Sequence, residues 1–262
     1  MIWRIAATVV VGVATGLLSA MFGVGGAVVS TPAIRALGAS ALEAVGTTLP
    51  SILPSAVTGT LRYRRAGLVE WRIVAVSGPA GAAAAVGGSF LSRAVPGRGH
   101  LLMVATAVLL GFAAVRAGLG RHEAVEPAEE EDQARPRRRV PGWRRAVIGL
   151  IAGGLSGLLG VGGGIVLVPA FTAWLGLPIK RAVGTSLACV GIIAVPGTLT
   201  HAFLGDIDWA FAVPLSVAVV PGAAIGARLA IRATDRTLRG VVAVALGGIA
   251  VLYGLLELLS LR

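Results

Sequence analysis

The chain alternates long uncharged runs with short charged segments. The uncharged runs cover 5–34, 44–61, 73–92, 99–115, 146–179, 182–205, 209–227 and 240–256. A membrane-spanning helix needs about 20 apolar residues, with a range of roughly 17–25. All eight runs are long enough, or nearly so, to cross a bilayer. The pattern therefore predicts an all-α, polytopic integral membrane protein with about eight hydrophobic segments.

The first and fifth runs differ from the others in length and in glycine content. Residues 146–179 contain no charged side chain over 34 positions, and one helix of that length would measure about 51 Å at ~1.5 Å per residue. The hydrocarbon core is only ~30 Å thick, and two complete helices with a turn need about 40 residues. We therefore predict that each run is broken, as a hairpin of two short helices bent at its glycines. The alternative is a single straight crossing.

An internal repeat relates the two halves of the chain. The segment "GLLSAMFGVGGAVVSTPA" (16–33) matches "GGLSGLLGVGGGIVLVPA" (153–170) at an offset of 137 residues, and "AVGTTL" (44–49) matches "AVGTSL" (182–187) at an offset of 138. The repeat predicts two transmembrane units, joined by a charged cytoplasmic linker. Because the first apolar run recurs inside the chain, we expect it to belong to the mature fold and not to a cleaved signal. The predicted units are 5–119 and 143–262, and the linker is 120–142.

Charge indicates how the two halves are oriented. The segment "RYRRAGLVEWR" (62–72) carries four arginines and one glutamate, whereas its counterpart "THAFLGDIDWA" (200–210) carries two aspartates and no Lys or Arg. Cytoplasmic loops are enriched in Lys and Arg, so equivalent loops of opposite charge are expected on opposite faces. This predicts two inverted repeats. With both long runs as hairpins, the basic segments 62–72, 116–145, 180–181 and 228–239 all fall on the cytoplasmic side.

The composition argues against several classes of function. Only 13% of residues are charged and the mean hydropathy is +0.87, whereas a soluble domain has about 25% charged residues. The net charge of +11 comes from arginines between apolar runs, which is typical of membrane topology and not of nucleic-acid binding. The single cysteine, Cys189, lies in an apolar run. No metal-ligand spacing, cofactor motif or set of catalytic residues is present, so no metal, cofactor, nucleic-acid partner or enzyme activity is expected.

The glycine motifs are the first candidate site. Irregular backbone survives at membrane depth only where it lines a cavity or is buried in protein. A broken helix presents free N–H groups and the positive end of a dipole, which favour an anion, and transporters use such breaks near the bilayer midplane. The competing interpretation is that the glycines only allow close helix packing. The candidate substrate-binding glycines are Gly23, Gly25, Gly26, Gly160, Gly162, Gly163 and Gly164.

Hydroxyl groups and one histidine complete the candidate site. Thr47, Thr48, Thr185 and Ser186 lie early in the second run of each half, where hydroxyl donors can bind an anion without a buried charge. In membrane helices such side chains also bond to their own backbone, so both interpretations stay open. His201 ends the sixth run close to two aspartates and is a candidate gating residue for a proton or the substrate. The alternative is a histidine at the membrane interface.

These motifs resemble those of a known family. Two ordered copies of "GLxSGxxGVGGGxxxVPA", each followed by "AVGTS" and by "G-x(3)-W", are similar to the TauE/SafE family of sulfite and organosulfonate exporters, and the resemblance covers 5–255. It implies a bacterial or archaeal multi-pass protein that moves small sulfur-containing anions. The first copy departs from the pattern at Ala20, Ala27 and Thr48, which leaves the substrate open. The second copy carries the motif on Gly160, Gly162, Gly163, Gly164, Pro169, Gly184, Thr185 and Ser186.

We therefore expect a secondary transporter of the prokaryotic cell membrane. It would export sulfite or an organosulfonate by alternating access, driven by an ion gradient or the membrane potential. Its expected partners are the small anion, the lipid bilayer and a coupling proton or sodium ion, and a homodimer stays open. The alternatives are an importer or channel for another small anion on the same scaffold, and a membrane scaffold that transports nothing.

Overall fold

The computed structural model describes residues 2–36, 38–39, 41–94, 100–119, 141–160 and 162–260. These ranges contain helices and turns, so the expected all-α class is confirmed for them. Most of the predicted linker, residues 120–140, with its acidic run 129–132 and its basic run 137–139, lies outside the described residues.

The described residues of the first half form five helices. Two of them come from the first apolar run, because that run is interrupted at its glycines as predicted. The prediction of two short helices was wrong for the first of the two, which has 21 residues, whereas the second has 10. The three later runs each form one helix. The helices are α1 (Ile2–Phe22), α2 (Ala27–Ala36), α3 (Ala41–Arg65), α4 (Trp71–Ala94) and α5 (His100–Leu119).

The second half follows the same plan within its described residues. Its first run is also interrupted at glycines, and the later runs again give one helix each. The helices are α6 (Gly142–Leu159), α7 (Gly164–Leu175), α8 (Ile179–Phe203), α9 (Trp209–Arg232) and α10 (Asp235–Ser260).

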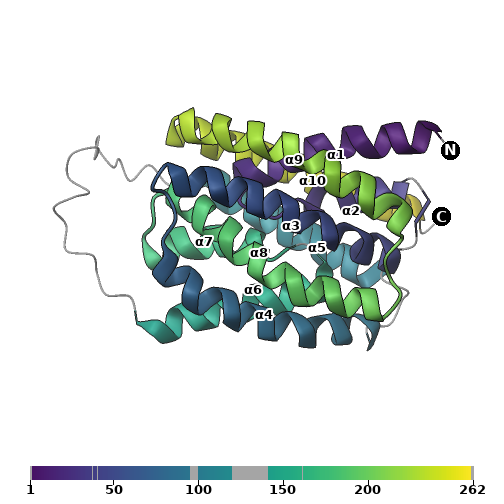
Figure 1. Cartoon of the computed structure of the whole chain (residues 1–262), viewed down its shortest axis with the longest axis horizontal. Coiled ribbons are helices and arrows are strands. Elements are labelled where there is room, and N and C mark those ends of the chain that lie inside the picture. Colours follow the sequence, from purple (N-terminus) through teal and green to yellow (C-terminus); the bar gives the residue numbers. More distant parts are fainter. Residues whose placement is uncertain are drawn as a thin grey trace.

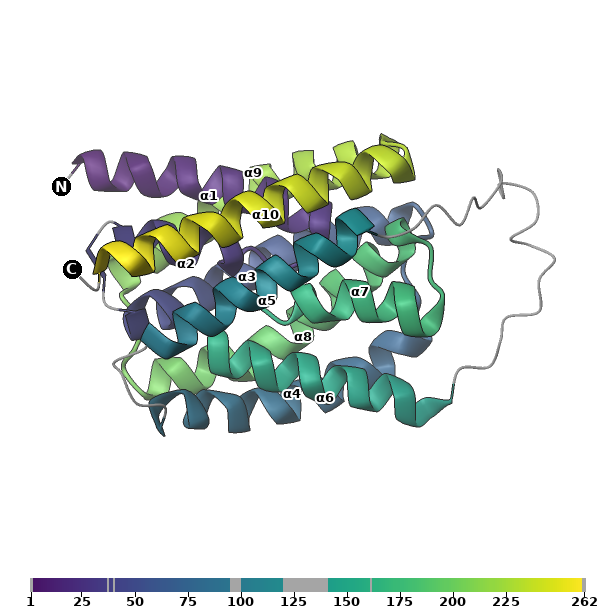
Figure 2. The same cartoon turned by 180° about the vertical axis from the view of Figure 1, so that it is seen from behind.

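The two broken runs enter the molecule from opposite ends. In Figure 1, α1 starts at the right end, and α2 turns back toward that end before α3 begins. By contrast, α6 starts at the left end, and α7 turns back toward the left before α8 begins, as the reverse view in Figure 2 also shows. The chain segments that follow keep these opposite directions, with α3 and α8 running antiparallel through the centre.

Each half packs the long arm of its broken run against the other half. α1 lies along α9, and α6 lies along α4, while α3 packs on α8 and α5 packs on α10. Stripes of small residues allow the close approach. A Cβ added at Gly149, Gly153 or Gly157 of α6 would collide with carbonyl oxygens of α4, those of Ser77, Gly81 and Ala85. This is small-xxx-small packing as found between membrane helices.

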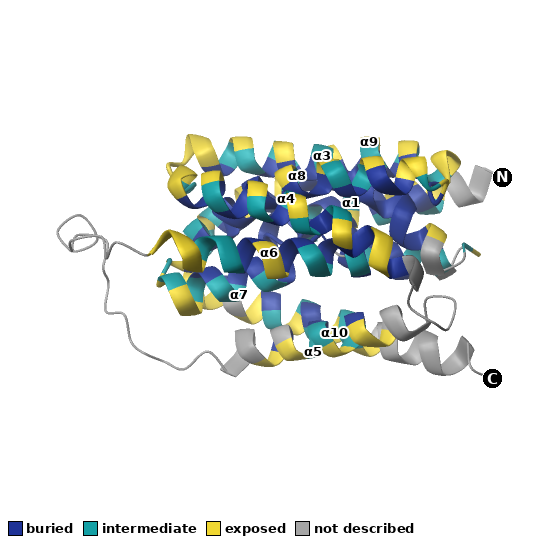
Figure 3. Ribbon diagram, turned by 90° about the horizontal axis from the view of Figure 1, so that it is seen from below, coloured by how far each residue is buried: buried dark blue, intermediate teal, exposed yellow. Residues whose placement is uncertain are grey.

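The surface of the helix bundle is apolar. Val10, Val108 and Val244 are 69%, 67% and 77% exposed, respectively, and Figure 3 shows that buried positions lie between the helices while exposed ones face outward. Among the described residues, Trp71–Ser92, Ile179–Phe203 and Trp209–Arg232 are helices long and apolar enough to cross a membrane. Apolar side chains that face outward over these lengths are expected of a protein that is solvated by lipid.

The two ends of the bundle differ in charge. The basic end, as we call it, is where α3 meets α4, α8 begins and α9 meets α10, and it lies at the left in Figure 1. Ion pairs join these segments, with Arg181 Nη1 lying 2.6 Å from Glu70 Oε1 and Lys180 Nζ lying 3.8 Å from Asp235 Oδ1. The acidic end is the opposite one, where α8 meets α9 and where Asp206 and Asp208 lie.

Candidate functional site

Left-handed backbone breaks the first and fifth apolar runs. Gly25 and Gly162, which match in the repeat, have φ angles of +87° and +81°, a region that glycine enters without strain and other residues rarely adopt. The two breaks also contain equivalent hydrogen bonds. Gly23 N–H donates to Ser19 C=O, and Gly160 N–H donates to Ser156 C=O, both at 2.8 Å. The two halves therefore build the same turn twice.

The two breaks touch each other inside the molecule. A Cβ added at Gly162 would lie 3.1 Å from the Val24 carbonyl oxygen and 3.4 Å from the Gly25 Cα. A Cβ at Gly164 would collide with the Gly23 carbonyl oxygen. Backbone therefore meets backbone, with no room for a side chain between the two loops. The structure brings Gly23 and Gly25 against Gly162 and Gly164, from segments that are more than 130 positions apart in the sequence. The other three candidate glycines face different neighbours, since an added Cβ would meet Thr15 at Gly26, Val45 at Gly160 and Ala152 at Gly163.

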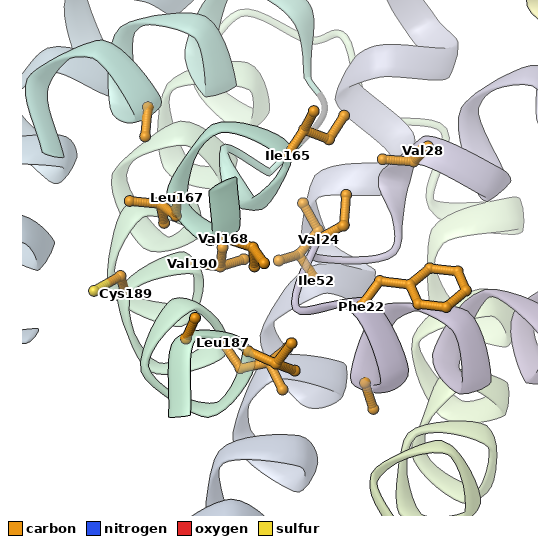
Figure 4. Packing of buried hydrophobic residues seen from close by; sticks show 14 of the residues in the cluster. Phe22, Val24, Val28, Ile52, Ile165, Leu167, Val168, Leu187, Cys189 and Val190 are labelled. Atoms are coloured by element: carbon orange, nitrogen blue, oxygen red, sulfur yellow. The ribbon is translucent and has the colours of Figure 1, made fainter. Parts of the chain in front are cut away.

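An apolar shell surrounds this contact. Val24 of the first break and Ile52 of α3 face Val168 of α7 and Val190 of α8, as Figure 4 shows. All four are nearly or fully buried. A small cavity bordered by Ser19, Phe22 and Gly26 lies beside the first break. The surroundings are thus of low polarity, and interactions of backbone dipoles there are stronger than in water.

Two helices begin at the contact. α2 starts at Ala27 and α7 starts at Gly164, directly after the breaks. A helix N-terminus carries a partial positive charge of roughly +0.5 and N–H groups without intrahelical partners. Two such termini therefore converge on one apolar region. Their arrangement suits an anion in chemical terms, and no carboxylate or basic side chain belongs to the two breaks.

The candidate hydroxyls divide into two groups. Ser186 Oγ donates to the Gly23 carbonyl at 2.7 Å, so this side chain contacts the first break directly. Thr48 Oγ1 lies 3.1 Å from Thr31 Oγ1 of α2 and donates to the Val45 carbonyl at 3.0 Å. Ser186 therefore contacts the first glycine break, and Thr48 contacts α2.

The hydroxyls of Thr47 and Thr185 bond to loops at opposite ends of the molecule and not to the glycine breaks. Thr47 Oγ1 accepts the N–H of Asp208 at 2.9 Å at the acidic end. Thr185 Oγ1 accepts the N–H of Glu70 at 3.0 Å at the basic end. These four residues match pairwise at an offset of 138, so each hydroxyl fastens the loop that precedes α9 or α4.

His201 is fully buried and does not lie at the surface. Its Nδ1 lies 3.0 Å from Oδ2 of Asp206, which is also buried. Its Nε2 is buried and has no hydrogen-bond partner among the described residues. The matching residue in the first half is Tyr63, whose longer side chain donates its hydroxyl to the Ala20 carbonyl at 3.0 Å. The two ends of the molecule therefore differ at this one matched position.

Sequence reasoning missed several buried polar groups. Ser55 Oγ donates to Ser19 Oγ at 2.9 Å and ties α3 to α1. Thr60 and Thr198, which match at an offset of 138, have buried hydroxyl oxygens without a partner among the described residues. The repeated tripeptide "GTL" at 59–61 and 197–199 was the available signal. A buried hydroxyl without a partner is costly, which makes these positions natural contacts for water or a polar ligand.

Replacing Thr185 with valine is expected to destabilise the protein by about 1–3 kcal/mol, because the partly buried N–H of Glu70 loses its acceptor. Thr185→Ser keeps the hydroxyl and is expected to cost about 0.8 kcal/mol, the value of one methyl group. Thermal unfolding of the purified protein in detergent, followed by circular dichroism, compares the two variants. Equal midpoints for the valine and serine variants would show that this hydrogen bond does not hold the loop.

Comparison with known proteins places the chain among membrane transporters. Residues 8–253 match the model of a family described as "Sulfite exporter TauE/SafE". A "Probable membrane transporter protein" of Xylella fastidiosa is 29% identical, and the match covers 85% of this chain and 82% of that protein. "Probable membrane transporter protein YunE" of Bacillus subtilis is 26% identical over 84% of this chain and 85% of its own length.

A third relative is considerably longer. "Probable membrane transporter protein MamO" of Paramagnetospirillum magneticum is 31% identical over 73% of this chain, which corresponds to 35% of its own length. No solved structure matches the chain significantly. The family match covers both broken runs and almost all of the helices, and it confirms the resemblance found in the repeated motifs. The chain belongs to the TauE/SafE sulfite exporter family of membrane transporters.

Proposed function

We propose that this chain is a secondary transporter of the prokaryotic cytoplasmic membrane that exports a small sulfur-containing oxyanion, such as sulfite or an organosulfonate. The observation that carries the proposal is the contact between the two glycine breaks, at which α2 and α7 both begin. Two helix N-termini that meet inside an apolar bundle offer an anion backbone donors without a buried cation. The named function of the family gives the substrate class.

The architecture that fits this function is a pair of inverted repeats, 5–119 and 143–262, in a multi-pass protein. Two observations support the proposal. The two hairpins begin at opposite ends of the molecule, and the first helix of each packs on a helix of the other half, α1 on α9 and α6 on α4. Secondary transporters with inverted repeats bind their substrate near the bilayer midplane, between discontinuous helices. The basic end would face the cytoplasm, in agreement with the positive-inside rule.

Substrate contacts in this proposal come from the backbone and from hydroxyls. The amides of Gly26 and Gly163 would donate to the oxyanion, because those of Ala27 and Gly164 already donate to the Gly25 and Gly162 carbonyls at 2.8 Å. Ser186 would turn its hydroxyl from the Gly23 carbonyl to the substrate. The two breaks occupy this space in the present conformation, so binding requires them to move apart. Donors fixed in a region that excludes water bind an anion more strongly than the same donors in water.

Alternating access would depend on the interactions that hold the loops before α4 and α9 at the two ends. At the basic end Thr185 and Arg181 both hold Glu70, and at the acidic end Thr47 holds Asp208. Release of one set while the other persists would open the central region to one side at a time. Rigid-body rocking of one repeat against the other is the usual motion of such folds. His201 would gate the acidic end, because it and Asp206 close the loop between α8 and α9.

The test is transport by the purified protein in proteoliposomes. Flux of labelled sulfite, sulfate and taurine is measured in both directions, with and without a pH gradient or a sodium gradient. The proposal expects one sulfur anion to be driven by a gradient, with protein-free vesicles as the control. Flux that never exceeds the passive rate set by the anion's own gradient would indicate a channel, and absence of flux for every sulfur anion would refute the substrate class.

Replacing His201 with glutamine is expected to uncouple transport from the pH gradient. Glutamine keeps a donor toward Asp206, but unlike an imidazole its amide cannot take up a proton and pass it on. Flux down the anion's own gradient should persist, while the acceleration by a pH gradient should disappear. A variant that responds to the pH gradient as strongly as the wild type would remove His201 from the coupling mechanism.

A further inference from the structure

A pocket of about 260 Å³ opens at the basic end, between the last turns of α3 and α9. It is lined by Arg62, Arg65 and Ala66 of α3 and by Arg228, Ile231 and Arg232 of α9. Drug-sized ligands occupy pockets of roughly 300–1,000 Å³, so this volume suits a smaller molecule. The pocket is distinct from the candidate site at the glycine breaks, because none of the candidate substrate-binding residues lines it.

The four arginines of this pocket differ in their ion pairing from other basic residues at the same end. None of them belongs to an ion pair among the described residues. Neighbouring basic residues at the same end behave differently, because Arg181 pairs with Glu70 and Lys180 pairs with Asp235. Arg62 and Arg65 are three positions apart on one helix, and Arg228 and Arg232 are four apart on the other, spacings at which like charges repel. The arrangement concentrates positive charge around one small space.

Helix termination does not explain this concentration. Basic side chains near a helix C-terminus offset its dipole, and that role requires no pocket. The ends of α8 and α4 repeat the same helix pair in the other half, and the residues that match the four arginines are Thr200, Phe203, Phe90 and Ala94. The same helix geometry is therefore built without arginines at these positions. Topology alone is served equally well by Arg64 and Arg236, which do not line the pocket.

We propose that this pocket is a binding site for a small oxyanion with a sulfate, sulfonate or phosphate group, held by Arg62, Arg65, Arg228 and Arg232. Guanidinium groups bind such oxygens through paired, charge-assisted hydrogen bonds. Two helices supply two arginines each, so one anion bridges α3 and α9 and removes the repulsion within each pair. The site holds α9 of one half against α3 of the other at the end that faces the cytoplasm in the proposed orientation.

The same chemistry is available from two sources. A soluble anion would make the pocket a cytoplasmic entrance, and in that case the inference rests on the proposed transport function. The phosphate of an anionic lipid would make it a lipid site that joins the two halves. Binding of either is an equilibrium property that is measured without transport, so its failure is separate from a failure of the proposed function.

The experiment compares two double variants that remove the same charge from the same end. Arg228→Gln with Arg232→Gln removes two of the four positive charges that line the pocket. Arg64→Gln with Arg236→Gln is the matched control. Inorganic sulfate is titrated into delipidated protein in detergent by calorimetry at low ionic strength. In a second arm, native mass spectrometry counts the phosphatidylglycerol retained by protein released from nanodiscs that contain neutral lipid with or without phosphatidylglycerol.

The pocket variant is expected to weaken binding of one probe by about tenfold or more, the factor lost with a single charge-assisted hydrogen bond, and the control by less than about twofold, as for screened surface charges. Loss confined to sulfate identifies a soluble anion, and loss confined to phosphatidylglycerol identifies a lipid headgroup. Equal losses in the two double variants, or wild-type binding of both probes by the pocket variant, would overturn the proposal. If the glutamine pair fails to fold, Arg65→Gln against Arg64→Gln makes the same comparison with single changes.

Discussion

Gly164→Ala is expected to abolish most anion flux in a protein that still folds and inserts. Alanine is favoured over glycine inside a helix, and Gly164 begins α7 without a positive φ, so the helix itself tolerates the change. The new methyl group would collide with the Gly23 carbonyl of the opposite break. An overpacking penalty of about 1–3 kcal/mol on the state in which the breaks touch lowers the equilibrium constant between that state and the separated, substrate-binding state roughly 5- to 150-fold. The transport cycle is then slowed at the step in which the breaks come together again.

The measurement is gradient-driven flux in proteoliposomes, normalised to the amount of folded protein. Gly111→Ala is the control, because this α5 glycine has open space around it, with nothing within 4 Å of an added Cβ. Gly162→Ala gives a second approach, since it forces a side chain into a φ of +81°. Normal flux by Gly164→Ala would mean that transport does not require contact between the two breaks.

Local signals in the sequence were sufficient for the breaks and for the charge asymmetry. A run of 34 uncharged residues with four glycines at 160–164 is too long for one helix and contains its own weak point. The basic segment 62–72 and the acidic segment 200–210 differ in composition alone, so the opposite character of the two ends could be predicted without a fold. Each of these inferences uses neighbours in the sequence.

Contacts between residues far apart in the sequence could not be predicted from these local signals. The sequence predicted two separate breaks, and only the fold brings Gly164 against Gly23. It identified Thr185 as a polar residue in a helix, but its partner, the N–H of Glu70, is 115 positions away. His201 ends an apolar run and could equally have been at the interface. The loop with Asp206 folds over it and buries it.

Gly153→Ala is expected to lower the stability of the folded protein strongly, whereas Gly154→Ala is expected to raise it slightly. A methyl group on Gly153 would collide with the Gly81 carbonyl of α4, and a methyl group on Gly154 meets nothing within 4 Å. Overpacking costs about 1–3 kcal/mol, whereas replacing a helical glycine that has free space gains roughly 0.5–1 kcal/mol. The two adjacent variants should therefore differ by about 1.5–4 kcal/mol in unfolding experiments in detergent.

The same pair of variants tests whether the packing of α6 on α4 positions the glycine break. Gly153 and Gly157 lie on the stripe that contacts α4, two turns and one turn before the break, respectively. A displacement of α6 at Gly153 would move Gly160 and Gly162 with it, because a helix transmits a shift along its axis. If the stripe sets the position of the break, flux per folded molecule falls in Gly153→Ala and is kept in Gly154→Ala. If flux falls only in proportion to the loss of folded protein, the stripe contributes to stability alone, and the contact between the breaks is maintained by α3 and α8.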